Sequence, residues 1–145
     1  ALPISIFCGH AGPSSFYVGY YDMSSSRPSS SLKLGILYNT DLYNNGVAQA
    51  DLSGVDIIIF AGCEAAGSVT SGYNLADSAR RAGAKVSIGW TAKTNSELFD
   101  WIDYFFEHLH AGNTVSSAKT YADEKMEYPS SQTSEIYGNS SFKLS

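Results

Sequence analysis

The sequence contains few charged residues and very few cysteines. Asp, Glu, Lys and Arg make up 16% of its 145 residues, and the net charge of −5 argues against nucleic acid as the main partner. Two cysteines, Cys8 and Cys63, are too few for a disulfide framework or for a zinc site of the usual spacing. We therefore expect no metal and no cofactor. No apolar run has the length that spans a bilayer, so we expect no membrane span.

The composition that remains is that of one globular domain. Hydrophobic residues make up 43% of the chain, enough for a core, and we expect a single domain over residues 1–145. The wealth of Ser, Tyr, Asn and Gly favours an exported or cell-surface protein, with a cytoplasmic location as the alternative.

One stretch organises the rest of the chain, and it reads Val55-Asp-Ile-Ile-Ile-Phe-Ala-Gly-Cys-Glu-Ala-Ala-Gly67. A continuous apolar run between turn residues predicts a strand buried on both faces. Such strands belong to parallel sheets covered by helices, whose ligands bind beyond the carboxyl ends of the strands. Cys63 stands at that end.

The remaining hydrophobic patterns predict alternating strands and helices. We expect strands over 4–8, 16–21, 85–90 and 136–144, a strand or turn over 34–38, and an exposed loop over 22–31. We expect helices over 71–81, from a capping box at 94–97 to about 112, and from Thr114 to about Pro129, with weaker helical character over 41–53. This order predicts an α/β, three-layer α-β-α sandwich around a mostly parallel sheet.

A histidine also follows a predicted strand. His10 lies in the turn after 4–8, so parallel neighbouring strands would bring it to the same sheet edge as Cys63. An imidazole beside a thiol, with free backbone amides nearby, is the constellation that nucleophilic catalysis needs. The alternatives are a cysteine that only fills space, a histidine on the surface, and a disulfide between Cys8 and Cys63.

Several ordered motifs resemble the caspase-fold cysteine peptidase clan, in particular its CHAT, gingipain-like and clostripain-like members. They are Ile6-Phe-Cys-Gly-His-Ala-Gly12, Asp56-Ile-Ile-Ile-Phe-Ala-Gly-Cys-Glu-Ala65, Ala82-Gly-Ala-Lys-Val-Ser-Ile-Gly-Trp90, the 105–118 segment and the closing 136–144 segment. The resemblance implies a caspase-like fold and a cysteine endopeptidase acting on a peptide or protein substrate.

The resemblance also implies roles for particular residues. His10 and Cys63 would form the catalytic dyad, and the backbone amides of Ala11, Gly12 and Cys63 would form the oxyanion hole. From their positions alone, and not from the resemblance, Glu64, Trp90 and Asp22 are the candidate substrate-binding residues, and an acidic residue in the pocket would favour Arg or Lys. The alternatives are that Glu64 faces solvent, that Trp90 belongs to the core, and that Asp22 lies in a plain linker.

The sequence also departs from the family pattern in two ways. Ala11 stands where the family usually has glycine, and the strands that normally precede the histidine strand are missing. We therefore expect that an N-terminal segment or another chain could complete the sheet. The alternative function is a non-catalytic binding or scaffold module on the same fold.

Overall fold

The computed structural model describes residues 3–21 and 32–144, and it has a mixed α/β architecture around a mostly parallel sheet. The strand order is β1-β7-β8-β9, with β1, β7 and β8 parallel and β9 antiparallel to β8. The bounds of these strands are Ile4–Cys8, Ile57–Ala61, Val86–Trp90 and Ser134–Gly138. The parallel strands that were predicted to carry His10 and Cys63 are therefore direct neighbours.

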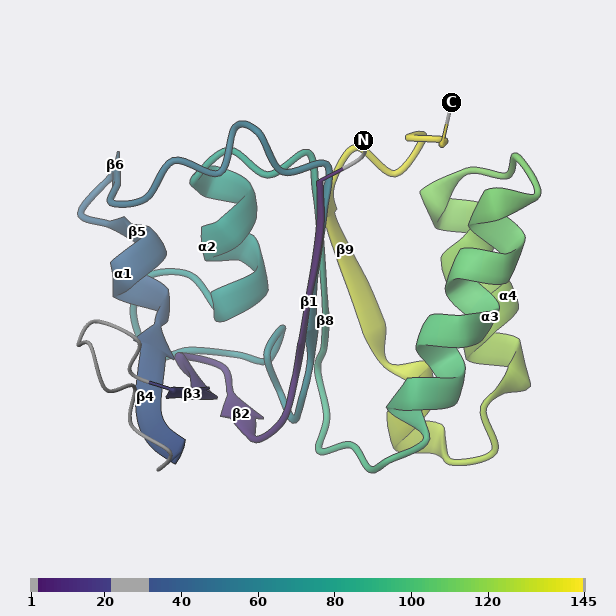
Figure 1. Ribbon diagram of the computed structural model, residues 1–145, viewed down its shortest axis with the longest axis horizontal. Helices are drawn as coiled ribbons and strands as arrows, with labels where there is room; N and C mark the ends of the chain where they lie inside the picture. Colours follow the sequence, from purple (N-terminus) through teal and green to yellow (C-terminus); the bar gives the residue numbers. More distant parts are fainter. Residues whose placement is uncertain (1–2, 22–31, 145) are drawn as a thin grey trace.

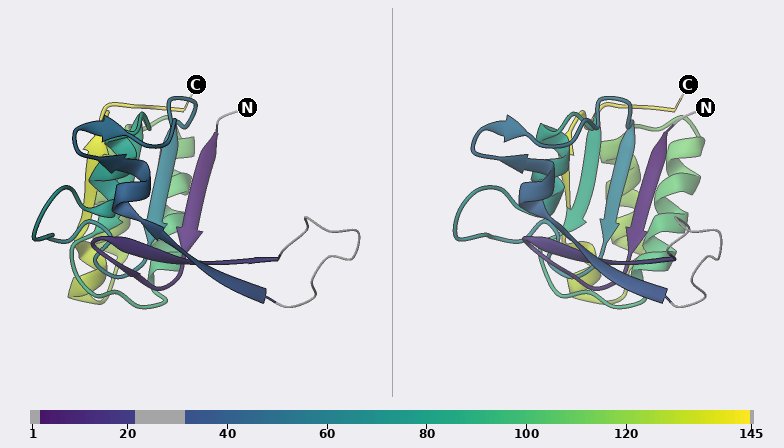
Figure 2. Two further views of the ribbon diagram at one scale, coloured as in Figure 1. Left: turned by 90° about the vertical axis from the view of Figure 1, so that its left-hand side faces the viewer. Right: turned by 60° about the vertical axis from the view of Figure 1, so that its left-hand side comes forward.

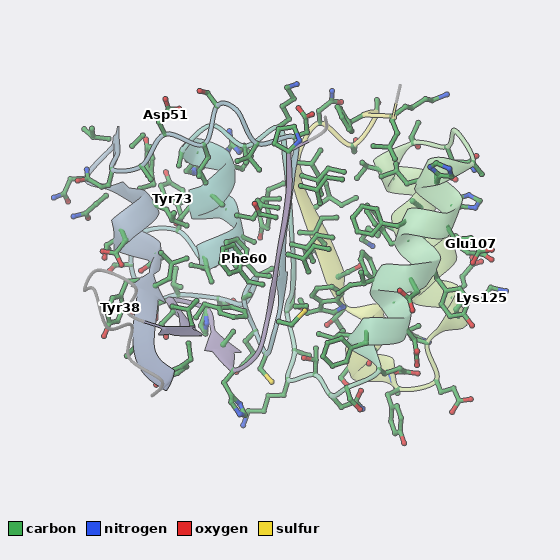
Figure 3. All side chains as sticks on the ribbon, in the orientation of Figure 1. Tyr38, Asp51, Phe60, Tyr73, Glu107 and Lys125 are labelled. Carbon is green, nitrogen blue, oxygen red and sulfur yellow. The ribbon has the colours of Figure 1, made fainter. Side chains whose placement is uncertain are left out.

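Helices cover both faces of this sheet (Figure 1). On one side are α1 (Asn39–Leu42) and α2 (Leu75–Arg81), and on the other are α3 (Leu98–His110) and α4 (Val115–Lys125). Every residue of β7 is buried because its side chains alternate between the two sides. Ile57 and Ile59 join the core beneath α3 and α4, while Phe60 points toward the α2 side (Figure 3).

The apolar faces of the three longer helices lie where the sequence predicts them. The residues predicted to face inward on α2 are at most 4% exposed, namely Leu75, Ala76, Ala79 and Ala82. The same holds on α3 and α4 for Leu98, Trp101, Phe105, Leu109, Val115, Ala118 and Ala122. Ile102, predicted on the same stripe of α3, is only half-buried and packs at the margin of this core. By contrast Glu107 lies on the outer side of this layer, away from the sheet (Figure 3). Helical periodicity therefore identified the packed faces correctly.

The Asp123 carboxylate on α4 links α3, α4 and β9 by hydrogen bonds. The Asp123 carboxylate accepts hydrogen bonds from Trp101 Nε1 at 2.7 Å and from Ser134 Oγ at 2.7 Å. It also accepts one from Lys119 Nζ at 2.9 Å. Because these donors come from α3, α4 and β9, one half-buried carboxylate connects three elements.

The segment between β1 and β7 forms a small sheet of its own. The strand predicted at 16–21 is present as β3 (Ser15–Tyr21), and it lies between β2 (Ala11–Gly12) and β4 (Leu32–Tyr38). The ribbon of β3 and β4 extends past the carboxyl end of β1 (Figure 2).

The helix expected over 41–53 is mostly wrong. After the four residues of α1 the chain forms a small hairpin of β5 (Tyr43–Asn44) and β6 (Val47–Ala48). Its turn residues, Asn45 and Gly46, have φ values of 51° and 78°. An Asn-Gly pair with two positive φ values favours a tight hairpin over a helix.

Three boundaries near the helices also need correction. α2 begins at Leu75 because Asn74 caps it, its side chain accepting from Asp77 N–H. The capping box at 94–97 does not form, and α3 begins at Leu98 with Glu97 making other contacts. The 142–144 segment is not a strand. Its Phe142 carbonyl instead accepts from Val115 N–H at the start of α4.

β1 is the outer strand of the described sheet. Among residues 3–21 and 32–144, β7 is its only sheet partner, and Ile6 at its centre is 42% exposed. A 3₁₀ turn, η1 (Pro129–Gln132), leads into β9 at the opposite edge. Within the described part of the chain, no helix is both long and apolar enough to cross a membrane.

Candidate functional site

His10 and Cys63 lie at the same edge of the central sheet. β1 and β7 pair in parallel with Cys8 opposite Ala61, and each residue of interest follows its strand by two positions. Figure 2 shows β1, β7 and β8 as adjacent arrows that end at one edge. The side chain of His10 is exposed and that of Cys63 is half-buried.

The two turns that carry these residues are in close contact at Gly62. A Cβ atom added to Gly62 would lie 2.6 Å from the Gly9 carbonyl oxygen and 2.7 Å from the Ala11 Cβ. Such separations are far shorter than ordinary van der Waals contact, so only glycine fits at this position. The close approach fixes the His10 turn directly against the Cys63 turn.

A cavity of about 290 Å³ lies between the carboxyl ends of the parallel strands. His10 and Cys63 both line it, together with Gly9, Ala61 and Gly62 from the first two strand ends. The loop after β8 and the first turn of α3 close the other side with Thr94, Asn95, Ser96, Leu98 and Phe99. The structure therefore brings the predicted dyad into one pocket.

The Cys63 sulfur has its own hydrogen-bonding environment. Thr94 N–H donates to Cys63 Sγ at 3.3 Å, and the Thr94 hydroxyl lies 3.8 Å from the sulfur. The thiol in turn donates to the Thr94 carbonyl at 3.6 Å. A backbone N–H beside the sulfur can stabilise negative charge there, as a thiolate nucleophile requires. Among the described residues, the structure places no hydrogen bond between His10 and Cys63.

The backbone amides predicted for the oxyanion hole divide into two groups. Tyr17 N–H donates to the His10 carbonyl at 2.9 Å, so these two residues form a hydrogen-bonded pair of the β2–β3 ladder. Because such pairs alternate, the Ala11 amide faces away from β3 and the Gly12 amide faces toward it. The Cys63 amide has no backbone acceptor in the described part of the chain. Ala11 and Cys63 are therefore the stronger candidates for the oxyanion hole, since their amides face away from the β2–β3 ladder or lack a backbone acceptor.

Two of the predicted substrate-binding residues do not line the pocket. Trp90 is fully buried in the core, where it packs edge-on against Trp101 and donates from Nε1 to the Ser131 carbonyl. It shares a strand face with Ile88, on the α3–α4 side. Glu64 is half-buried outside the cavity and has a left-handed backbone with φ of 55°. Asp22 lies outside the described residues.

Glu64 still contributes to the shape of the site through its backbone. Its N–H donates to the Ala92 carbonyl and its carbonyl accepts from Gly67 N–H. These bonds hold a non-glycine residue in a sparsely populated conformation directly after Cys63, a situation found often at functional sites.

The residues on the third side of the pocket were not among the predicted site residues. Thr94 was interpreted as part of a helix cap, and Phe99 was not singled out. The signal was nevertheless present, because 91–97 follows a third predicted parallel strand and must emerge at the same sheet edge.

The two cysteines are free thiols, and they differ in environment. Cys8 is exposed on β1, and the partial burial of its sulfur raises the pKa of the Cys8 thiol. Cys63 lies in the pocket described above. Within the described residues no three potential ligands among His, Cys, Asp and Glu are grouped as they would be around a metal ion.

Comparison with models of known protein families found no match, and a search of curated proteins found no similar sequence.

Proposed function

We propose that this chain is a cysteine endopeptidase of the caspase fold, with Cys63 as the nucleophile and His10 as the acid–base group. The single observation that carries the proposal is that both side chains line one cavity at the carboxyl ends of adjacent parallel strands. The order of the strands and the helices on both faces of the sheet support the caspase-like assignment.

The proposed reaction begins with transfer of the Cys63 proton to His10. The thiolate attacks the carbonyl carbon of the scissile peptide bond, and the resulting oxyanion is stabilised by the amides of Ala11 and Cys63. The C–N bond then breaks as His10 donates its proton to the departing amine, leaving a thioester on Cys63. Water attacks the thioester, His10 accepts its proton, and the carboxylic acid product leaves as the thiol is restored.

Alkylation by iodoacetamide tests the dyad, with Cys8 as an internal control. In the native chain at near-neutral pH, Cys63 should react at least tenfold faster than Cys8, because a base assists Cys63 and burial raises the pKa of Cys8. His10→Ala should lower the alkylation rate of Cys63 by at least tenfold and leave the alkylation rate of Cys8 unchanged. Mass spectrometry after timed quenching measures both rates.

Peptide hydrolysis completes the test. A mixture of proteome-derived peptides should be cleaved by the native chain and by Cys8→Ala, but not by Cys63→Ala or His10→Ala. The proposal fails if Cys63 is no more reactive than Cys8 and the folded chain cleaves no peptide.

The second candidate is a non-catalytic binding module on the same fold. It is favoured by the hydrogen bonds of the Cys63 sulfur, which go to Thr94 and not to His10. Under this function the pocket binds a peptide segment without cleaving it, so Cys63→Ala would retain the full affinity.

We further propose that an additional strand, from a preceding segment or from another chain, pairs with β1. The outer position of β1 and the exposure of Ile6 support this pairing. Composition supports an exported or surface location, which fractionation of the native source would test.

A further inference from the structure

The cavity beside Cys63 is lined without a single Asp, Glu, Lys or Arg side chain among the described residues. Of the lining residues that the structure describes, only His10 and Cys63 can titrate, and the other side chains are apolar or neutral. A charged side chain entering this space would lose hydration without meeting an opposite charge. The cavity therefore suits an uncharged guest.

Phe99 is the exposed apolar side chain that lines the cavity on the α3 side. It stands in the first turn of α3, and it is 58% exposed although it is a large aromatic residue. Leu98 beside it is 4% exposed and belongs mainly to the core. A guest side chain would cover Phe99, and burial of apolar surface favours binding.

The charged groups of this region lie in a neighbouring hollow. That hollow is lined by Glu97, Asp100, Lys125 and Glu127, and it adjoins the Cys63 cavity only through Asn95 and Ser96. Glu64, the acidic residue next to the cysteine in sequence, does not line the cavity either. Within residues 3–21 and 32–144, the carboxylates nearest to the cavity are thus separated from the reactive sulfur.

The cavity volume of about 290 Å³ is at the lower limit of ligand pockets, which span roughly 300–1,000 Å³. The cavity has room for one large amino-acid side chain but not for a larger ligand.

We infer that the residue on the amino side of the scissile bond carries an apolar side chain, such as Leu, Met or Phe, and that Phe99 is the specificity-determining residue. This inference rests on the proposed peptidase function. It assigns to the cavity a substrate class opposite to the Arg or Lys that an acidic pocket would select.

Peptidyl chloromethyl ketones that differ only in their last residue test the inference. Cys63 Sγ bonds to the methylene carbon and chloride leaves, so mass spectrometry can follow the labelling. The Leu and Phe probes should label Cys63 at least tenfold faster than the Lys probe, because a pocket without counter-charge discriminates by roughly this factor or more.

Two matched variants locate the preference. Phe99→Ala should reduce the discrimination to less than threefold, and its exposure means that the fold tolerates the change. Tyr128→Ala removes an aromatic ring that is 56% exposed but lines the neighbouring hollow, and it should leave the discrimination unchanged.

A binding measurement separates this inference from the peptidase function. Acetylated tripeptide amides ending in Leu or Lys are titrated into Cys63→Ala and followed by NMR shifts. If the Leu peptide binds at least tenfold more tightly but no probe labels the native chain, the inference stands and the peptidase function falls. Equal or faster labelling by the Lys probe overturns the inference and leaves the peptidase function intact. If no probe labels Cys63 and the Leu peptide does not bind more tightly than the Lys peptide, both the inference and the peptidase function are overturned.

Discussion

Gly62 joins the two halves of the site at the scale of a single residue. An added Cβ would meet backbone and side-chain atoms at 2.6–2.7 Å, and the backbone carbonyl of Gly9 cannot move aside cheaply. Relief requires separating the turn of His10 from the turn of Cys63. The glycine therefore protects the geometry of the site as much as the stability of the chain.

Gly62→Ala should lower the free energy of unfolding by about 1–3 kcal/mol, the usual cost of overpacking. Alkylation of Cys63 should also lose its dependence on His10, because the two turns are pushed apart. Gly54→Ala is the control, since nothing lies within 4 Å of its added Cβ. Urea unfolding and timed alkylation measure the two effects, and equal stability of the two variants would contradict the close contact.

Individual residues of the site were predictable to different degrees. His10 and Cys63 could be placed together because both follow strands that the sequence pattern made parallel. For Trp90 the sequence left core and pocket wall as alternatives, and the structure shows the core, where period-two alternation puts it on the face of Val86 and Ile88. Phe99 could not be recognised, because its exposure depends on where α3 begins, and Glu97 sets that start through tertiary contacts.

Glu97 connects elements. Its carboxylate accepts hydrogen bonds from Glu127 N–H at 2.5 Å and from Tyr128 N–H at 3.2 Å, which ties the start of α3 to the segment after α4. Burial acts to raise the pKa of Glu97, but these hydrogen bonds outweigh it, and the net pKa is lowered from its ordinary value.

A lowered pKa in the folded chain has a definite consequence for stability. The stabilisation from Glu97 is complete above the unfolded pKa, near 4.5, and it is lost as the pH falls through the lower folded value. Glu97→Gln should therefore reduce the fall in unfolding free energy below about pH 5. Glu124→Gln, at an exposed position on α4, should follow the native curve. Urea unfolding midpoints measured between pH 3 and 7 test this expectation. If the midpoints of the native chain, Glu97→Gln and Glu124→Gln change with pH in parallel, the proposed role of Glu97 is refuted.

Elements with a strong local signal were the ones that the sequence predicted well. The apolar stripe of α3 and the Thr114 cap of α4 are local patterns, and both were confirmed. The pairing of β3 with β4 depends on contacts that short apolar runs do not specify. The hairpin of β5 and β6 did have a local signal, the Asn45-Gly46 turn, which the weak helical pattern of 41–53 obscured. The capping box at 94–97 failed because Glu97 has stronger partners elsewhere in the chain.

The whole molecule is built from two cores separated by one sheet. The core beneath α3 and α4 contains both tryptophans, and the other packs Phe16 and Phe60 under α2. β7 contributes residues to both cores, β8 contributes to the core beneath α3 and α4, and both strands are buried along their full length. β1 has several half-buried or exposed positions and one sheet neighbour among the described residues.

Amide hydrogen exchange should reveal this difference directly. Peptides from 57–61 and 86–90 should exchange only through global unfolding, whereas those from 4–8 should exchange through local opening and at least tenfold faster. Mass spectrometry of the native chain, with a urea series to identify the global process, measures both. Equal protection of 4–8 and 57–61 would show that β1 is held as firmly as the centre.

His10 follows the outer strand and Cys63 follows a central one, so the dyad has one partner on the loosest part of the sheet. For the proposed chemistry this means that warming separates the partners before it melts the chain. A sample can then be fully folded by circular dichroism and yet inert, and cooling restores it. The temperature range in which the enzyme works is thus limited by how stably the five residues of β1 pair with β7. A ligand that binds and stabilises β1 would therefore act as an activator without contacting the Cys63 sulfur.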